Sequence, residues 1–183
     1  MLKNSLFRHA NWFIEEFLNK KIITTLKHFP GHGSATEDSH LGFTDITETW
    51  SRDELIPYQQ LCANEYQEMI MVGHLYNANL DSIYPATLSY NVVSNLLRNE
   101  IGFKGVIISD EMLMGAIVSY YQFDKAIELA INAGIDILLY STNKYQNQSL
   151  VRQVIDIVQQ KVMAGLIPQQ RADKSYNRIM HLF

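Results

Sequence analysis

Gly105-Val106-Ile107-Ile108-Ser109-Asp110 is the stretch that decides the fold of this chain. A strand that is apolar at almost every position is typical of a parallel sheet covered on both faces, because neither face meets water. Three other stretches are expected to form strands of the same kind, at 22–27, 68–73 and 135–140. Helical segments separate the four strands, and such alternation indicates parallel βα units. The sequence therefore predicts an α/β fold with four parallel strands and helices on the outside.

Helices are expected before, between and after these strands. Their predicted spans are 5–19, 51–66, 90–99, 123–133, 147–163 and 168–181. Ser51-Arg52-Asp53-Glu54 matches a capping box, but Pro57 lies early in the same helix, so its start stays open between residues 51 and 56. Ser89 is expected to cap the helix at 90–99.

Length and composition limit the class of protein. The chain has 183 residues, whereas a complete eight-stranded βα barrel needs about 250. A formal net charge of −4 and a pI near 5.8 argue against the basic face that a nucleic acid needs. A run of about 18 apolar residues, as a membrane span needs, is absent from the sequence, and its start has no apolar leader, so a cytoplasmic protein is expected. A single cysteine, Cys62, excludes an intrachain disulfide.

Polar residues stand at the carboxyl ends of three predicted strands, where barrel enzymes hold their active sites. Lys27 and His28 end the first strand, His74 ends the second and Asp110 follows the third. Neighbouring strand residues alternate in direction, so Lys27 and His28 can share one side only if the backbone bends. The Phe29-Pro30 pair that follows them supplies a reason for such a bend.

Asp110 has two interpretations from the sequence alone. Its carboxylate could attack the anomeric carbon of a sugar and form a covalent intermediate. It could instead cap a helix that starts at once, with Glu111 in the first turn, where the helix dipole favours an acid.

The loop after the first strand is rich in groups that can titrate. It contains Lys27-His28-Phe29-Pro30-Gly31-His32-Gly33 and then Asp38-Ser39-His40. A βα connection usually has about 2–6 residues, so a loop that reaches Trp50 is expected to be functional. His40 could donate and accept a proton near neutral pH, and Asp38 could hold its imidazole in one tautomer.

Zinc binding is the alternative for these histidines. The candidate ligands are His28, His32, Asp38 and His40. The first two stand four residues apart, but Pro30 and Gly31 lie between them and exclude the regular helix that this spacing would need. A zinc site also leaves Asp110 without a role. We therefore expect no metal.

Several motifs together resemble glycoside hydrolase family 3, in particular its β-N-acetylhexosaminidases. They are Lys27-His28-Phe29-Pro30-Gly31-His32-Gly33, Asp38-Ser39-His40, Ile70-Met71-Val72-Gly73-His74, Tyr84-Pro85-Ala86-Thr87-Leu88-Ser89, the stretch from Leu96 to Asp110, and Ala133-Gly134-Ile135-Asp136-Ile137-Leu138-Leu139. The resemblance implies a TIM barrel. In that family the lysine-histidine motif sits near the middle of the barrel, whereas here it begins at residue 27. The chain resembles the second half of the barrel, as one partial domain over residues 1–183.

The resemblance also implies an activity and roles for the site residues. Asp110 would be the nucleophile of a retaining hydrolase that removes terminal N-acetyl-β-D-hexosamine, because relatives with an Asp-x-His loop prefer N-acetyl sugars. Asp38 and His40 would form the acid/base pair, and Lys27 and His28 would bind sugar hydroxyls. His74 is expected to bind substrate as well. No cofactor is implied.

An inactive protein is the alternative to this hydrolase. The half barrel could be inactive, because the family also uses residues from strands that would precede residue 1.

The expected ligand is an N-acetyl-β-glucosaminide or a muropeptide-like saccharide. Two chains are expected to pair through the exposed edge strands at 22–27 and 135–140, because free backbone groups recruit other chains.

Overall fold

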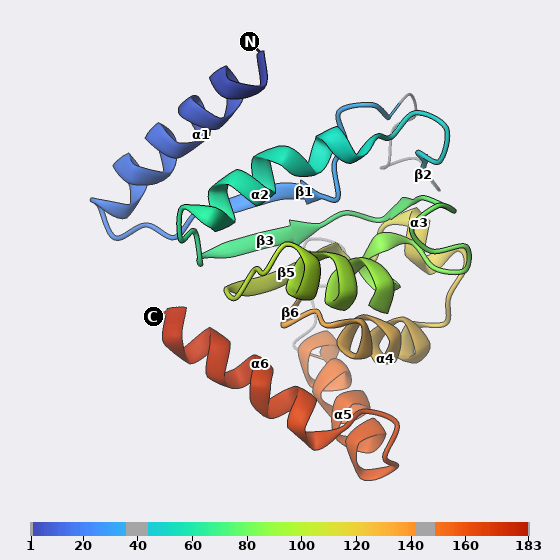
Figure 1. Ribbon diagram of the computed structural model, residues 1–183. Coiled ribbons are helices and arrows are strands. Elements are labelled where there is room, and N and C mark those ends of the chain that lie inside the picture. Colours follow the sequence, from blue (N-terminus) through green and yellow to red (C-terminus); the bar gives the residue numbers. More distant parts are fainter. Residues whose placement is uncertain (1, 36–43, 142–148, 183) are drawn as a thin grey trace.

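The computed structural model describes residues 2–35, 44–141 and 149–182, with side chains from residue 7 onward. Four parallel strands form the main sheet in the order β1-β3-β5-β6. Their bounds are Thr25–Phe29 for β1, Met69–Val72 for β3, Val106–Glu111 for β5 and Ile137–Leu139 for β6. Strands adjacent in the sheet are joined by helical segments, as parallel pairing requires. The predicted α/β fold, half of a βα barrel, is confirmed (Figure 1).

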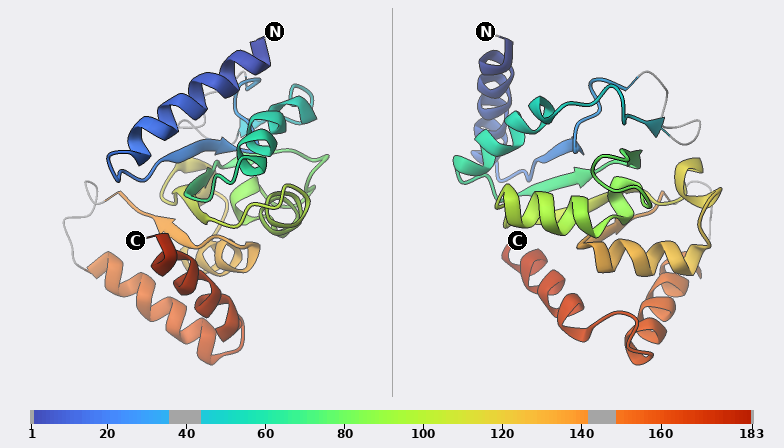
Figure 2. Two further views of the ribbon diagram at one scale, coloured as in Figure 1. Left: turned by 60° about the vertical axis from the view of Figure 1, so that its left-hand side comes forward. Right: turned by 45° about the vertical axis from the view of Figure 1, so that its right-hand side comes forward.

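Helices cover the outer face of this sheet and both ends of the molecule (Figure 2). They are α1 (Leu2–Leu18), the 3-10 turn η1 (Arg52–Leu55), α2 (Ile56–Ala63), the 3-10 turn η2 (Ala86–Leu88), the π-helix η3 (Asn91–Glu100), α3 (Gly115–Val118), α4 (Phe123–Ala133), α5 (Ser149–Met163) and α6 (Gln169–Leu182). α1 lies beyond α2, on the side of β1, and α5 and α6 lie at the opposite side of the molecule (Figure 1).

The core lies between the sheet and its outer helices. Ile70, Val72 and Ile107 are fully buried and pack with Leu55 and Leu97 from the helices. Alternate strand residues point to the other face, which a complete barrel would enclose. Met71, Ile108 and Ile137 are register partners in a row on that inner face, and all three are only half-buried.

The observed boundaries of β1 and α2 can be compared with the predicted ones. β1 begins at Thr25 and ends at Phe29, later than the predicted 22–27. α2 begins at Ile56, and Ser51 makes no capping hydrogen bond with its side chain, so the later of the two predicted starts is correct. Ser89 does cap the next helix, because the Val92 N–H donates to its Oγ over 3.1 Å.

The interpretation of Asp110 as a helix cap is wrong. β5 continues through Asp110 to Glu111, and the next helix begins only at Gly115. Pairing with β6 extends the strand, since Glu111 is in register with Leu139. The Glu111 carboxylate does not sit in a first helical turn. It accepts hydrogen bonds from the backbone N–H of Leu113 and of Ser141, both over 3.1 Å.

A buried carboxylate fastens the amino-terminal end of the sheet. Asp136 stands immediately before β6, and its completely buried side chain makes ion pairs with Arg98, Arg171 and Arg178. Its oxygens also accept from the Ile107 backbone N–H (3.0 Å) and the Ser175 hydroxyl (2.7 Å). Burial is the main cause that lowers the pKa of Arg98 to about 10, and repulsion from the other two guanidiniums contributes to the same shift. Because about 10 is still well above neutral pH, Arg98 stays charged there.

Candidate active site

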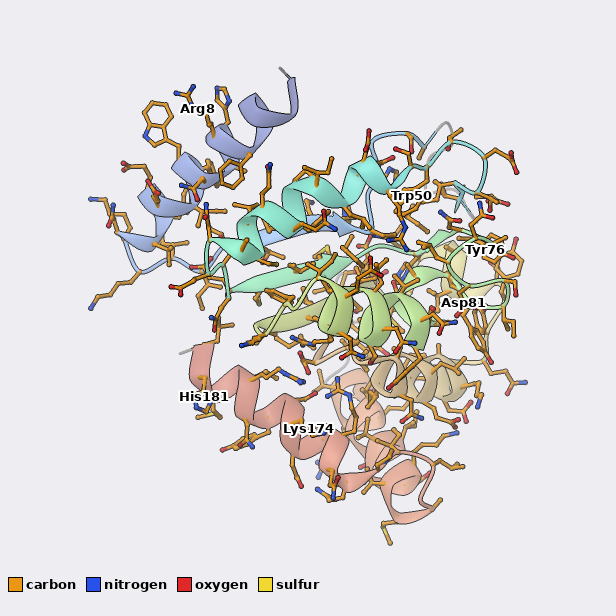
Figure 3. All side chains as sticks on the ribbon, viewed as in Figure 1. Arg8, Trp50, Tyr76, Asp81, Lys174 and His181 are labelled. Atoms are coloured by element: carbon orange, nitrogen blue, oxygen red, sulfur yellow. The ribbon has the colours of Figure 1, made fainter. Side chains whose placement is uncertain are left out.

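The predicted site residues come from adjacent strands and meet at one end of the sheet. Lys27 and His28 lie in β1, His74 follows β3 and Asp110 lies near the end of β5. Parallel strands bring their carboxyl ends to the same edge, which is where barrel proteins place their chemistry. Figure 3 shows Trp50, Tyr76 and Asp81 at this end of the molecule and His181 at the opposite end.

Asp110 presents its two carboxylate oxygens to different partners. Oδ1 accepts a hydrogen bond from the backbone N–H of Glu111 over 2.8 Å. Oδ2 lies 3.7 Å from Nε2 of His28, and the Asp110 side chain is 18% exposed. One oxygen is thus held by the backbone, and the other faces a polar group across a partly open site.

The end of β1 departs from a regular strand, and this brings His28 toward Asp110. The register between β1 and β3 shifts between Leu26 and Phe29. The Lys27–His28 and Phe29–Pro30 peptide bonds are both cis. Lys27 is exposed and His28 is half-buried at this edge. The register shift corresponds to the bend predicted at this point.

Two side chains from the segment before α2 fix the start of the loop that follows β1. The Trp50 indole N–H donates to the Pro30 carbonyl over 3.0 Å. The Glu54 carboxylate accepts from the Gly33 N–H over 3.1 Å and from the Ser34 hydroxyl. Gly31 has a φ of +126°, and a Cβ there would lie 2.4 Å from a Glu54 oxygen, so the position requires glycine. Glu54, the last residue of the predicted capping box, therefore lies in η1 and holds the start of the loop after β1.

The predicted acid/base pair lies outside the described residues. Asp38 and His40 belong to the segment 36–43, and their roles stay predictions. The structure describes the two ends of that loop. It leaves at Ala35 and returns at β2 (Thr44–Asp45), which pairs in parallel with β4 (Leu75–Tyr76) next to His74.

His74 lies behind the site surface. It is 1% exposed, and both ring nitrogens contact protein oxygens: Nδ1 is 2.9 Å from Thr87 Oγ1 and Nε2 is 2.9 Å from the Glu111 carbonyl oxygen. Burial is the main cause that lowers the pKa of His74. Substrate contact by His74 stays a prediction. Nothing in the sequence around Thr87 predicts that its hydroxyl contacts the His74 ring.

The described part of the chain contains no group of three or more His, Cys, Asp or Glu side chains arranged to hold a metal ion. The rings of His28 and His32 are tilted by 55° relative to each other, with centroids 5.7 Å apart. The zinc interpretation also needs Asp38 and His40, which lie in the segment 36–43 and are not described.

A parallel βα sheet with a carboxylate and polar side chains at the carboxyl ends of its strands defines a protein of the βα-barrel class. Residues 4–182 match the family described as the Glycosyl hydrolase family 3 N terminal domain. The match covers nearly the whole chain, so the chain belongs to this family. The resemblance inferred from the motifs is confirmed.

Similar proteins are longer than this chain. The beta-hexosaminidase LpqI of Mycobacterium tuberculosis (strain ATCC 25618 / H37Rv) is 34% identical over 179 residues, which cover 93% of this chain and 44% of LpqI. The solved structure of M tuberculosis LpqI gives a TM-score of 0.85 at 31% identity, over 98% of this chain and 52% of that chain. A glycoside hydrolase family 3 beta-N-acetylglucosaminidase from Paenibacillus sp. str. FPU-7 gives a TM-score of 0.83 at 31% identity, over 92% of this chain and 32% of that chain.

The expectation of a cytoplasmic location is overturned by a third relative. A protein of Arthroderma benhamiae (strain ATCC MYA-4681 / CBS 112371) is named an uncharacterized secreted glycosyl hydrolase, with 31% identity over 167 residues that cover 88% of this chain and 46% of that protein. Composition and the start of the sequence supply no physical basis for the expectation. Among the described helices, none is both long and apolar enough to cross a membrane.

Proposed function

We propose that this chain carries the nucleophile of a retaining glycoside hydrolase that removes terminal, non-reducing N-acetyl-β-D-hexosamine. The geometry of Asp110 is the main support. Its Oδ1 is held by a backbone N–H and its Oδ2 faces the partly open end of the sheet. A carboxylate fixed in this way can attack an anomeric carbon without first losing rotational freedom.

The reaction takes two steps. In the first, Asp110 Oδ2 bonds to the anomeric carbon while the bond to the glycosidic oxygen breaks, and His40 gives that oxygen a proton. In the second, water attacks the same carbon, gives a proton to His40 and releases the Asp110 carboxylate. Two inversions leave the product in the β configuration. Asp38 would orient the His40 imidazole.

The substrate is proposed from the relatives and from the charge of the site. LpqI is named a beta-hexosaminidase, and the Paenibacillus protein a beta-N-acetylglucosaminidase. Lys27 and His28 stand at the same edge as Asp110 and would hold sugar hydroxyls. The substrate would be an N-acetyl-β-glucosaminide, with a muropeptide-like saccharide as the natural form. The two steps need no cofactor.

The second candidate is a half barrel that binds sugar without turning it over. The half-buried row Met71, Ile108 and Ile137 favours it, because the described part of the chain does not fully cover these inner-face side chains. Sugar contacts missing from that side would remove transition-state stabilisation as well as affinity.

One assay separates these candidates. The purified chain is incubated with an aryl N-acetyl-β-glucosaminide, and proton NMR records which anomer forms first. The proposed function predicts the β anomer, and His40→Ala should lose less activity with this substrate than with a disaccharide, whose leaving group needs a proton. The α anomer as first product would contradict retention. No hydrolysis by the chain, with hydrolysis by a longer gene product, would favour the second candidate.

We further propose that two chains associate through their edge strands. In the described sheet, β1 and β6 each pair on one side only. Backbone groups on a free edge bind other strands, and pairing β1 of one chain with β6 of another would give eight strands. Light scattering at micromolar concentration should therefore give about twice the mass of 21.1 kDa. A single species of 21.1 kDa would rule this assembly out.

A further inference from the structure

A line of hydrogen-bonding groups runs behind the Asp110 carboxylate. It begins at Thr87 Oγ1, passes through the His74 ring and ends at the backbone of Glu111, with 2.9 Å at each contact of the ring. Thr87 is completely buried and His74 is 1% exposed. The line therefore acts on residues inside the protein, and the backbone that it reaches is the carbonyl of Glu111, the residue that follows Asp110.

The proton positions on this line follow from the chemistry of its end groups. The Glu111 carbonyl oxygen can only accept, so Nε2 of His74 carries a proton. The single hydrogen of the Thr87 hydroxyl has three acceptors in reach: Nδ1 of His74 (2.9 Å), the Gly73 carbonyl (2.8 Å) and the Val72 carbonyl (3.1 Å). In a neutral ring the hydroxyl donates to Nδ1, and in a charged ring it donates to a carbonyl. Nε2 is protonated in both states.

The Glu111 residue is held at both of its backbone polar groups. Its carbonyl accepts from His74, and its N–H donates to Asp110 Oδ1 over 2.8 Å. The Glu111 carboxylate is occupied by the N–H groups of Leu113 and Ser141, so it does not compete for the ring. The N–H belongs to the Asp110–Glu111 peptide and the carbonyl to the Glu111–Met112 peptide, so the two bonds hold both peptides that flank the Glu111 Cα. Holding the second peptide limits rotation at Glu111 and so keeps its N–H in place against Asp110 Oδ1.

We propose that His74 is a positioning residue for the nucleophile: its Nε2–H fixes the Glu111 carbonyl, Thr87 fixes the ring, and together they aim Asp110 Oδ2 at the anomeric carbon. This inference rests on the proposed function for its effect on rate. Its hydrogen-bond pattern stands without it. A buried ring with both nitrogens bonded to protein oxygens acts through Asp110, and no contact with the sugar is needed.

Kinetic measurements on three variants, Thr87→Val, Thr87→Ser and Thr24→Val, test the positioning role. The substrate is an aryl N-acetyl-β-glucosaminide, and the variants are made in whichever protein, this chain or its longer gene product, hydrolyses it. Thr87→Val removes the hydroxyl and keeps the shape of the side chain. It should lower kcat by about 10- to 100-fold, because small displacements of a reacting group cost this much, with KM within about twofold. Thr87→Ser keeps the hydroxyl and should restore most of kcat.

The matched control is Thr24→Val. Thr24 is also buried, and its hydroxyl bonds to the Glu68 carboxylate at the other end of the sheet. The control also loses a buried threonine hydroxyl and its hydrogen bond, but far from Asp110, so it should lose stability and keep kcat. A Thr87→Val enzyme with normal kcat, or equal losses of kcat in Thr87→Val and Thr24→Val, would overturn the positioning role.

Nitrogen-15 NMR of the His74 ring tests the proton pattern without any measurement of activity. The expected spectrum shows a proton on Nε2 in the wild-type chain, and Thr87→Val should shift the Nδ1 resonance. A neutral ring with its only proton on Nδ1 would overturn the inference even in an active enzyme. If the wild-type protein proves inactive while Nε2 is protonated, the proposed function fails and the hydrogen-bond line stands.

Discussion

Asp110→Asn should abolish turnover of an aryl N-acetyl-β-glucosaminide. The asparagine oxygen can still accept from the Glu111 N–H that now bonds to Oδ1, so the backbone around the site should keep its conformation. What disappears is the charged oxygen that faces His28 at 3.7 Å. A neutral amide cannot form the glycosyl ester, and loss of a covalent nucleophile costs on the order of 10⁴- to 10⁶-fold in kcat.

The control for this variant is Asp156→Asn, an exposed aspartate on α5 that should leave kcat unchanged. Asp110→Gly in sodium azide gives a second measurement, because azide can enter the space of the missing carboxylate and attack the anomeric carbon. The product should be the α-glycosyl azide, from a single inversion. An Asp110→Asn enzyme that retains more than about a hundredth of wild-type kcat would exclude Asp110 as the nucleophile.

Asp136→Asn should destabilise the folded protein severely. The buried carboxylate is the shared partner of Arg98, Arg171 and Arg178. An amide of the same shape leaves three guanidiniums close together with their counter-charge removed. Removal of one partner from a buried ion pair costs about 3–5 kcal/mol in the free energy of unfolding.

Urea denaturation measures this loss. Asp173→Asn is the matched control, since Asp173 is exposed on α6 and accepts a hydrogen bond from Gln169 of the same helix. Its free energy of unfolding should change by less than about 0.5 kcal/mol. If Asp136→Asn changed the free energy of unfolding no more than this control, Asp136 would not be what holds α6 and η3 to the amino-terminal end of the sheet.

The sequence predicts strands best where burial alone decides them. β5 is apolar over Val106–Ile108, and its start and the position of Asp110 near its end follow from the pattern. β1 is less predictable. Lys27 and His28 are polar and stand just before its last residue, Phe29, so the hydrophobic pattern is interrupted inside the strand. The position of Glu111 is mispredicted for a different reason, since pairing with Leu139 in β6 overrides the preference of an acid for a helix start.

The contacts of the residues behind the candidate site, such as His74 and Glu54, cannot be predicted from the sequence. The position of His74 at the strand end follows from the pattern of β3, but its burial depends on Thr87, thirteen residues later, and on the Glu111 carbonyl. Glu54 matches a helix cap in sequence because the pattern of a capping box is local, whereas its actual partner, Gly33, is distant along the chain. Contacts of this kind depend on tertiary geometry, which spacing along the chain does not report.

The residues that stabilise the fold and the candidate site residues lie at opposite ends of the sheet, and this separation matters for evolution. The ion pairs of Asp136 lie at the amino-terminal end of the sheet, whereas Lys27, His28 and Asp110 lie at the carboxyl-terminal end. Substitutions at the carboxyl-terminal end can therefore accumulate while the ion pairs at the other end keep the fold intact. Under the proposed function, a lineage that starts from this chain would change its sugar binding through Lys27 without compensating mutations around Asp136.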